Sequence, residues 1–357
     1  MYYYNIHNIV KVKSEVSLYE LEYFASNDFV TDDADIVINI KDSITSGIHF
    51  KRTLIPESHH NFHKVKYSEH FGSLGAQFSI EFSDKVKINI NKLITASRHV
   101  IYVNLVEPIL RFVLISKGFV LLHSACIDIK GNGILFSAPP DTGKTTTVLK
   151  CIKSGFSFLS DDMTIVRLPS EAICFPKPMT ISAHTYKTAT TVADNNYDKI
   201  QYKLRSLIHS KRGRQFMHKL ANYNVPIFTL NTIGQAIIKP PKFKIENLLQ
   251  SVTIEEKTKV KSLYFLERGD NEQREEIPTK MALRKAIDNS DDAFLFPPYA
   301  DLIHHINIGG KTAKELLKEE TNMLEKFLSG VNCLIIKSDK RAWYEMVIET
   351  AQLKVNK

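Results

Sequence analysis

The sequence contains little glycine, few cysteines and no long hydrophobic run. Glycine accounts for 14 of the 357 residues, which excludes a glycine-rich, low-complexity protein and makes the position of each glycine informative. The four cysteines lie far apart and form neither a CxxC pair nor a zinc-ligand spacing; they are Cys126, Cys151, Cys174 and Cys333. This pattern predicts a reducing compartment.

The chain also lacks recognisable targeting segments. Its first residues, MYYYNIHNIVKVKSEV, have no basic region followed by an apolar region, so they do not resemble a signal peptide. The longest apolar stretch, RFVLISKGFVLLHSA, is broken by Lys117 and Gly118 and is too short for a membrane span. The net charge of +8 is a modest excess for this length and indicates a solvated basic surface. We therefore expect a soluble, cytoplasmic protein.

The length predicts two domains, and the first is rich in β-strands. Residues 1 to about 100 contain short segments in which apolar and polar residues alternate, at 6–12, 35–40, 48–54, 62–67, 77–82 and 86–90. We expect a mostly antiparallel sheet with PESHHN as a connector. His59, His60 and His63 have no cysteine or carboxylate at ligand spacing, so a metal site is disfavoured there. No chemical constellation stands out in this region.

Residues 101–357 have the pattern of an α/β domain. We expect a short strand near residue 100, a helix over 107–116 that ends at Gly118, and one strand over 119–129. A strand over 134–137, a helix from 144 to about 154 and a strand over 156–159 follow. Towards the C-terminus we expect strands over 262–266 and 331–336 and helices over 279–287, 311–330 and 341–353.

The segment APPDTGKTTT nearly matches the phosphate-binding loop G-x-x-x-x-G-K-[ST], known as Walker A. It follows an apolar strand and begins a helix, as that loop requires. Backbone N–H groups of such a loop converge on phosphate oxygens, Lys144 would reach the β- and γ-phosphates, and the Thr145 hydroxyl would help to hold Mg²⁺. The predicted nucleotide-binding residues are Ala138, Pro139, Pro140, Asp141, Thr142, Gly143, Lys144, Thr145 and Thr146.

Two carboxylates follow the next apolar strand. Asp161 and Asp162 lie 17 and 18 residues after Lys144. If consecutive strands are neighbours in the sheet, both carboxylates face the loop. One could coordinate Mg²⁺ and the other could accept a proton from an attacking hydroxyl.

The ordered set of motifs resembles the catalytic core of the HPr kinase/phosphorylase superfamily, which shares a phosphate-loop fold with phosphoenolpyruvate carboxykinases. The resemblance covers about 45 residues closely and includes His123, Gly131, Gly133, Gly143–Lys144–Thr145, Gly155 and Asp161–Asp162. It implies an α/β, HPr kinase-like catalytic domain preceded by the β-rich α+β region. It also implies that Asp161 is the catalytic base, that His123 supports that carboxylate or a bound phosphate, and that Asp162 serves Mg²⁺ or hydrogen bonding at the strand end.

By this resemblance, the chain is an ATP- and Mg²⁺-dependent kinase that transfers the γ-phosphoryl group to a hydroxyl of a protein, a peptide or a small molecule. Two departures set it apart from the bacterial regulatory enzyme: Ala138 replaces the first loop glycine, and the glycine-rich C-terminal signature is missing. HPr is therefore not the expected acceptor, and the reverse phosphorylase reaction is not expected. Because relatives often assemble, the resemblance is compatible with a homo-oligomer.

Two other interpretations stay open. A nucleotide-binding switch or assembly factor with little catalysis is favoured by the stiff Pro139–Pro140 loop. The basic stretch 203–219 is the candidate contact for phosphate or acceptor, through Arg205, Arg212 and Arg214. It has no recognised nucleic-acid motif, so nucleic acid is the less favoured partner.

Overall fold

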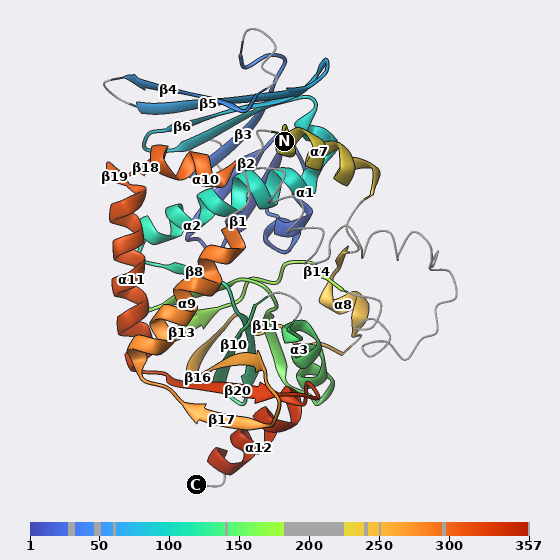
Figure 1. Ribbon diagram of the computed structural model, residues 1–357, viewed down its shortest axis with the longest axis vertical. Coiled ribbons are helices and arrows are strands. Elements are labelled where there is room, and N and C mark those ends of the chain that lie inside the picture. The colour runs from blue at the N-terminus through green and yellow to red at the C-terminus, as the bar shows by residue number, and fades with distance from the viewer. Residues whose placement is uncertain are drawn as a thin grey trace. The chain divides into compact units, whose positions relative to one another are not determined.

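The computed structural model describes residues 1–27, 33–45, 51–59, 62–139, 142–181, 225–238, 242–249, 251–294 and 298–355. Within these ranges the chain is a mixed α/β protein (Figure 1). Its residues form two compact units. Unit 1 contains the described parts of Met1–Gly118, Leu207–Pro240 and Phe294–Glu319, and unit 2 contains those of Phe119–Ser206, Pro241–Ala293 and Glu320–Lys357. The sequence-based division has a single boundary near residue 100, whereas the chain passes between these units several times.

Unit 1 is built on a seven-stranded sheet in the order β1-β2-β3-β7-β6-β5-β4. The pairs β2–β3 and β3–β7 are parallel, and all other neighbours in this sheet are antiparallel. The strands are β1 (Tyr2–Ile6), β2 (Val10–Ser14), β3 (Ile36–Lys41), β4 (Thr53–His59), β5 (Phe62–Phe71), β6 (Leu74–Phe82) and β7 (Val86–Asn91). The expected mostly antiparallel sheet is therefore present.

Two local predictions in this region are wrong. The segment 6–12 is not one strand, because His7 and Asn8 adopt positive φ angles of 52° and 59° and form the turn between β1 and β2. PESH is not a connector but the second half of β4. Pro56 is tolerated there because β4 is an edge strand whose one partner among the described strands is β5, so one missing N–H donor costs little.

The expected strand near residue 100 is also wrong, because this segment is helical. α1 (Arg98–Ile101), a π-helical turn (Tyr102–Val106) and α2 (Glu107–Ser116) follow one another, and the Ser97 side chain caps α1 by accepting from the Val100 N–H at 3.3 Å. Residues Arg98–Ser116 are long and apolar enough to cross a membrane by length and composition. However, 83% of the most apolar window is buried, as in the core helix of a folded domain. Gly118, at φ +83°, ends the helix as expected.

Unit 2 contains a nine-stranded mixed sheet. Its path is β11-β9-β10-β16-β13-β12-β8, and β20 joins β16 and β17. The strands are β8 (Val120–Leu122), β9 (Ala125–Ile129), β10 (Asn132–Ser137), β11 (Ser157–Ser160), β12 (Thr164–Arg167), β13 (Glu171–Ile173), β16 (Lys257–Arg268), β17 (Gln273–Glu276) and β20 (Asn332–Ser338). The expected single strand over 119–129 is wrong: it breaks at His123–Ser124, because β8 pairs with β12 whereas β9 pairs with β10 and β11.

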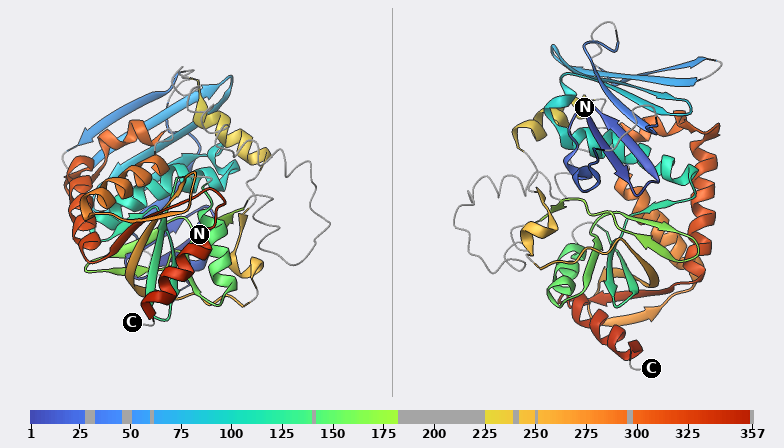
Figure 2. Two further views of the ribbon diagram at one scale, coloured as in Figure 1. Left: turned by 60° about the horizontal axis from the view of Figure 1, so that its bottom comes forward. Right: turned by 180° about the vertical axis from the view of Figure 1, so that it is seen from behind.

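Helices cover both faces of this sheet. Alternate strand residues point to opposite faces, so Phe136 packs in one core cluster and Leu135 in the other. The first cluster includes side chains of α3 (Lys144–Lys153) and α12 (Trp343–Val355), which lie side by side (Figure 2). The second includes side chains of α9 (Thr279–Phe294) and α11 (Ala313–Ser329). Unit 2 is therefore a three-layered α/β unit in its described part.

Candidate functional site

The strand directions bring the predicted site residues to one edge of the sheet in unit 2. β9 lies between β10 and β11 and is antiparallel to both. β10 and β11 therefore run in the same direction, and their carboxyl ends lie at the edge where β9 begins. Three groups of predicted site residues lie at this edge: the loop after Ser137, the aspartates after Ser160, and His123 before β9. The two loop-bearing strands are not direct neighbours as we expected, but the intervening strand preserves the convergence.

Three cationic or titratable side chains surround Asp162. Lys177 Nζ lies 2.7 Å from Asp162 Oδ2, His123 Nε2 lies 3.3 Å from Oδ1, and Lys144 Nζ lies 3.8 Å from Oδ1. The side chains of Lys177 and His123 are each 8% exposed, whereas that of Asp162 is 46% exposed. Asp162 is thus the accessible member of an otherwise enclosed charged cluster.

Asp161 has a different environment. Its residue is only 6% exposed, and its Oδ2 accepts a hydrogen bond from the Thr145 hydroxyl at 3.0 Å. Its Oδ1 is buried and has no hydrogen-bond partner among the described residues. Because a buried acceptor without a partner is costly, this oxygen is a candidate ligand atom.

The two neighbouring carboxyl groups are driven to opposite pKa values. Burial raises the pKa of Asp161 to about 6, and Lys144 only partly offsets this effect. Burial also acts to raise the pKa of Asp162, but Lys177, the His123 hydrogen bond and Lys144 hold it well below its ordinary value. Such divergence between adjacent groups is typical of sites in which each has a separate role.

The phosphate-loop sequence forms the expected junction between strand and helix (Figure 1). Thr142 donates to the Pro139 carbonyl through its backbone N–H and its hydroxyl, at 3.4 and 2.8 Å. Gly143 is the N-cap of α3 and offers no side chain to the first-turn N–H groups, and that turn contains no acidic residue. These features suit an anion at the helix N-terminus. Pro140 and Asp141 lie outside the described residues.

The structure explains the residue type at two loop positions, 138 and 143, in a way that the sequence did not indicate. Ala138 is 1% exposed, packs in the core and is not among the described residues with positive φ, so replacing the motif's first glycine imposes no backbone strain here. Gly143 has φ +133°, and a Cβ atom at this position would lie 2.6 Å from the Trp343 ring. Glycine is therefore needed at 143 for packing as well as for backbone conformation.

His123 is held from both sides of its ring. Its Nδ1 lies 2.8 Å from the Asn289 carbonyl oxygen, and Nε2 points to Asp162. The Asn289 side chain donates to the Ser137 hydroxyl at 3.0 Å, which in turn donates to the His123 carbonyl at 3.3 Å. Because a carbonyl oxygen only accepts, Nδ1 is the donor to Asn289 in this arrangement.

The donor set suits a nucleotide and a magnesium ion, on two observations. Lys144 Nζ is buried, its pKa is lowered by burial, and it makes no hydrogen bond within the described ranges. Thr145 and Asp161 place a hydroxyl and a carboxylate side by side, and Mg²⁺ prefers such oxygen ligands. The described residues contain no group of three or more His, Cys, Asp or Glu side chains that could hold a metal alone. Mg²⁺ sites of nucleotide enzymes usually need only one or two protein carboxylates, since phosphates and water supply the rest.

Sequence reasoning missed two groups in this site, Lys177 and the Asn289–Ser290 pair. Lys177 is the single charged residue of the apolar segment CFPKPM, which was the available signal. Asn289 and Ser290 contact His123 from α9, 166 and 167 residues away in the chain, and nothing in the sequence pattern connects them. The predicted contacts Arg205, Arg212 and Arg214 lie outside the described residues.

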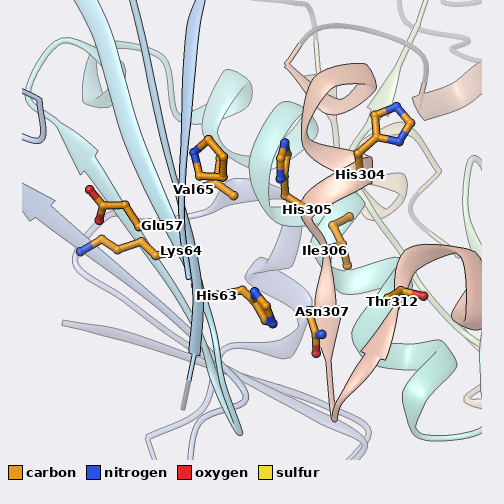
Figure 3. Close-up of a pocket in the computed structure, with 10 residues that line it drawn as sticks. Glu57, His63, Lys64, Val65, His304, His305, Ile306, Asn307 and Thr312 are labelled. Carbon is orange, nitrogen blue, oxygen red and sulfur yellow. The ribbon is translucent and has the colours of Figure 1, made fainter. Parts of the chain in front are cut away.

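Unit 1 contains a separate cavity of about 130 Å³. Its lining includes His63 from β5 and His304 and His305 from a short helical turn, as Figure 3 shows, together with Glu57 from β4. Burial and the neighbouring His304 lower the pKa of His305, which favours neutral imidazole. Among the residues that the structure describes, these side chains do not form a group of three or more that could hold a metal ion.

No protein-family model matches the chain, and no curated protein is significantly similar to it in sequence. The resemblance to the HPr kinase/phosphorylase superfamily thus depends on the ordered motifs themselves.

Proposed function

We propose that unit 2 is an ATP- and Mg²⁺-dependent phosphotransferase of the HPr kinase/phosphorylase type, which transfers the γ-phosphoryl group to a hydroxyl acceptor. The observation that carries this proposal is a pair of buried atoms that make no hydrogen bond to any described residue, Lys144 Nζ after β10 and Asp161 Oδ1 after β11. One is a cation suited to phosphate, and the other is an anion suited to a metal. A strand-to-helix turn without a ligand would have no use for either.

In this proposal the phosphates lie on the N-terminus of α3 and against Lys144. The acceptor oxygen forms a bond to the γ-phosphorus, the bond from that phosphorus to the β,γ-bridging oxygen breaks, and the hydroxyl proton passes to a carboxylate. Mg²⁺, when bound, neutralises charge on the β- and γ-phosphate oxygens. Catalysis is then largely a matter of positioning and charge compensation.

The contacts favour exchanging the roles that the resemblance implied for the two aspartates. Asp161 is buried beside Thr145, so an acceptor hydroxyl has little access to it. A metal ion held by both Asp161 and the Thr145 hydroxyl suits this position better. Asp162 is half-exposed and flanked by two lysines, which makes it a poor metal ligand and an accessible acceptor for a hydroxyl hydrogen bond. Its low pKa is no obstacle, because a loose transition state needs orientation of the nucleophile more than a strong base.

Manganese binding tests this assignment. In the exchanged arrangement, Asp161→Asn weakens binding of Mn²⁺ in the presence of ATP, as measured by electron paramagnetic resonance, and Asp162→Asn leaves it close to that of the wild-type protein. The reverse result would restore the assignment implied by the resemblance. Lys144→Ala, which weakens ATP binding itself, is the control for loss of the nucleotide.

Transfer itself is tested with γ-labelled ATP and Mg²⁺ in a cell extract fractionated into small molecules, proteins and peptides, and RNA. Label in one fraction that depends on Lys144 would identify the acceptor class. The second candidate, a nucleotide-controlled switch, is favoured by Pro139, which fixes the backbone at the start of the loop. Stoichiometric ATP binding without any Lys144-dependent label would support the switch.

A further inference from the structure

His123 lies at a break in the sheet, between the end of β8 at Leu122 and the start of β9 at Ala125. Its backbone N–H donates to the Ser290 hydroxyl at 3.3 Å, and its backbone carbonyl accepts from the Ser137 hydroxyl at 3.3 Å. Both serines are buried. Because buried backbone groups need hydrogen-bond partners, these two hydroxyls replace the strand partner that the break removes.

One face of α9 brings a hydroxyl to this break. Ala282 and Ala286 are buried in the second core cluster of unit 2, and Ser290 follows them at the same four-residue spacing. Residues spaced by four share one face of a helix, and small side chains let that face lie close to the sheet. The local sequence of α9 therefore places Ser290, and Asn289 beside it, at His123.

Asn289 makes two contacts at the site. Its carbonyl oxygen accepts from His123 Nδ1 at 2.8 Å, which leaves Nε2 facing Asp162 Oδ1 at 3.3 Å. Its side-chain amide donates to the Ser137 hydroxyl at 3.0 Å. Because that hydroxyl gives its single proton to the His123 carbonyl, its oxygen needs a donor, and the amide supplies one. Ser137 is the last residue of β10 before the phosphate loop, so one side chain of α9 is joined both to the loop and to His123.

We propose that Asn289 is a positioning residue of the phosphotransferase. It acts through Ser137 and His123 and fixes the direction of the Asp162 carboxylate toward the acceptor hydroxyl. This inference rests on the proposed function. Lys177 contacts Oδ2 of Asp162 and His123 contacts Oδ1, so the two together set the plane of the carboxylate. Loss of the Asn289 amide frees His123 and Asp162 to turn, which slows transfer without removing a group that binds the nucleotide.

The test measures transfer and nucleotide binding separately on the full chain. With γ-labelled ATP, Mg²⁺ and cell extract, Asn289→Ala is expected to lower the rate of label transfer at saturating ATP about tenfold or more, because outer partners of a functional side chain typically contribute a factor of this order. The KM for ATP, and the affinity for the non-hydrolysable β,γ-imido analogue measured by calorimetry, should stay within about twofold of wild type. Asn332→Ala is the matched control, because the Asn332 amide donates to Glu276 at 3.4 Å on the surface of the same unit.

Two further variants test the link itself. Asn289→Asp keeps the shape but loses the amide donor, so it should be impaired like Asn289→Ala, and Ser137→Ala should have the same effect. Because both residues act on one hydrogen-bond chain, the double variant Asn289→Ala/Ser137→Ala should be little slower than either single variant. In the ligand-free protein, the nuclear magnetic resonance signal of the His123 ring, identified by its loss in His123→Gln, should shift in Asn289→Asp and stay in place in Asn332→Ala. If Asn289→Ala does not fold, as judged by thermal unfolding, Asn289→Asp and Ser137→Ala take its place.

Four results would each overturn the inference alone: an unchanged transfer rate in the Asn289 variants, an equal loss of transfer and of analogue affinity, fully additive effects of Asn289→Ala and Ser137→Ala, or an unmoved His123 signal. Equal loss would indicate that Asn289 supports the fold of the whole site. If the wild-type protein gives no label that depends on Lys144, the proposed function fails, and this inference fails with it.

Discussion

Both units contain buried carboxylates, and two of them, Glu69 in unit 1 and Asp161 in unit 2, have opposite hydrogen-bonding environments. In unit 1, Glu69 is 1% exposed; one of its oxygens accepts from the Tyr67 hydroxyl at 2.7 Å and the other from the Thr229 N–H at 2.5 Å. In unit 2, Asp161 has one bonded oxygen and one without a partner among the described residues. Burial raises the pKa of both groups. The difference teaches that burial alone does not mark a functional carboxylate, whereas an unsatisfied oxygen beside a phosphate loop does.

The Glu69 cluster has a structural explanation. Thr229 lies in the first turn of α7 (Ile227–Ile237), so the Glu69 carboxylate caps the N-terminus of that helix. The Thr229 hydroxyl completes the connection by donating to the Glu69 carbonyl at 3.0 Å and accepting from Ala76 N–H at 3.1 Å. The Thr229 N–H and hydroxyl, one Glu69 carboxylate oxygen, the Glu69 carbonyl and the Ala76 N–H together join α7 to the sheet.

The largest expected effect is that of Lys144→Ala. It removes the buried ammonium group, so nucleotide binding and any transfer should fall by about 10³-fold, since loss of one preorganised charge contact costs a factor of this order. Labelled-ATP binding and transfer measure it. Full binding by this variant would mean that the loop of unit 2 is not the nucleotide site.

The two buried carboxylates should respond oppositely to amide substitution. Glu69→Gln keeps the shape, but its amide group cannot accept from both the Tyr67 hydroxyl and the Thr229 N–H, so the free energy of unfolding should fall by about 1–3 kcal/mol. Chemical denaturation of the ligand-free protein measures the change. A variant as stable as wild type would show that the Glu69 cap contributes nothing.

Asp161→Asn should instead stabilise the ligand-free protein while it impairs metal binding. Because the folded pKa of Asp161 is about 6 and the unfolded value is lower, ionisation at neutral pH opposes folding. Removing that charge should increase the free energy of unfolding by about 1–3 kcal/mol at pH 7, and the gain should shrink as the pH falls through about 6, where wild-type Asp161 becomes protonated. Denaturation at pH 7 and pH 5 measures it. If Asp161→Asn lowered the free energy of unfolding at pH 7, it would contradict the proposal that this carboxylate is kept for metal binding at the expense of stability.

The same pKa predicts the pH dependence of metal binding. A protonated Asp161 cannot serve as a ligand, so apparent Mn²⁺ affinity in the presence of ATP should be highest above pH 6 and decline as the pH falls below it. Titrations between pH 5 and 8 provide the measurement. Asp161→Asn should have weak binding that lacks this inflection; an unchanged inflection would assign it to another group.

The smallest expected effects on stability come from alanine substitutions at two glycines with positive φ. Gly143→Ala brings a Cβ to 2.6 Å from Trp343 at φ +133°, so we expect a loss of about 1–3 kcal/mol of stability together with weaker nucleotide binding. Gly72→Ala, in the hairpin turn between β5 and β6 at φ +63°, meets no atom within 4 Å and should cost about 1 kcal/mol. Trp343 is the only tryptophan, so its fluorescence reports on the first site. Equal losses at both sites would mean that the ring does not constrain the loop.

The sequence by itself determined the mixed α/β class, most strands of the first sheet and the residues that surround the candidate site. Lys144, Thr145, Asp161 and Asp162 were identifiable because loop chemistry and strand periodicity are local properties, and His123 was identified only through the resemblance of the ordered motifs. The local pattern failed where tertiary packing overrode it, as in the β-branched run near residue 100, which became a buried helix.

Only the tertiary structure decided which side chains share a contact. Segments far apart in the chain come together at the site: the antiparallel strand β9 between β10 and β11, Lys177, and the α9 residues that hold His123. It also decided how the two aspartates differ, since a pKa depends on burial and on neighbouring charges in space. Adjacent residues of one type look equivalent in a sequence, and their surroundings make one a buried metal-ligand candidate and the other a half-exposed, ion-paired carboxylate.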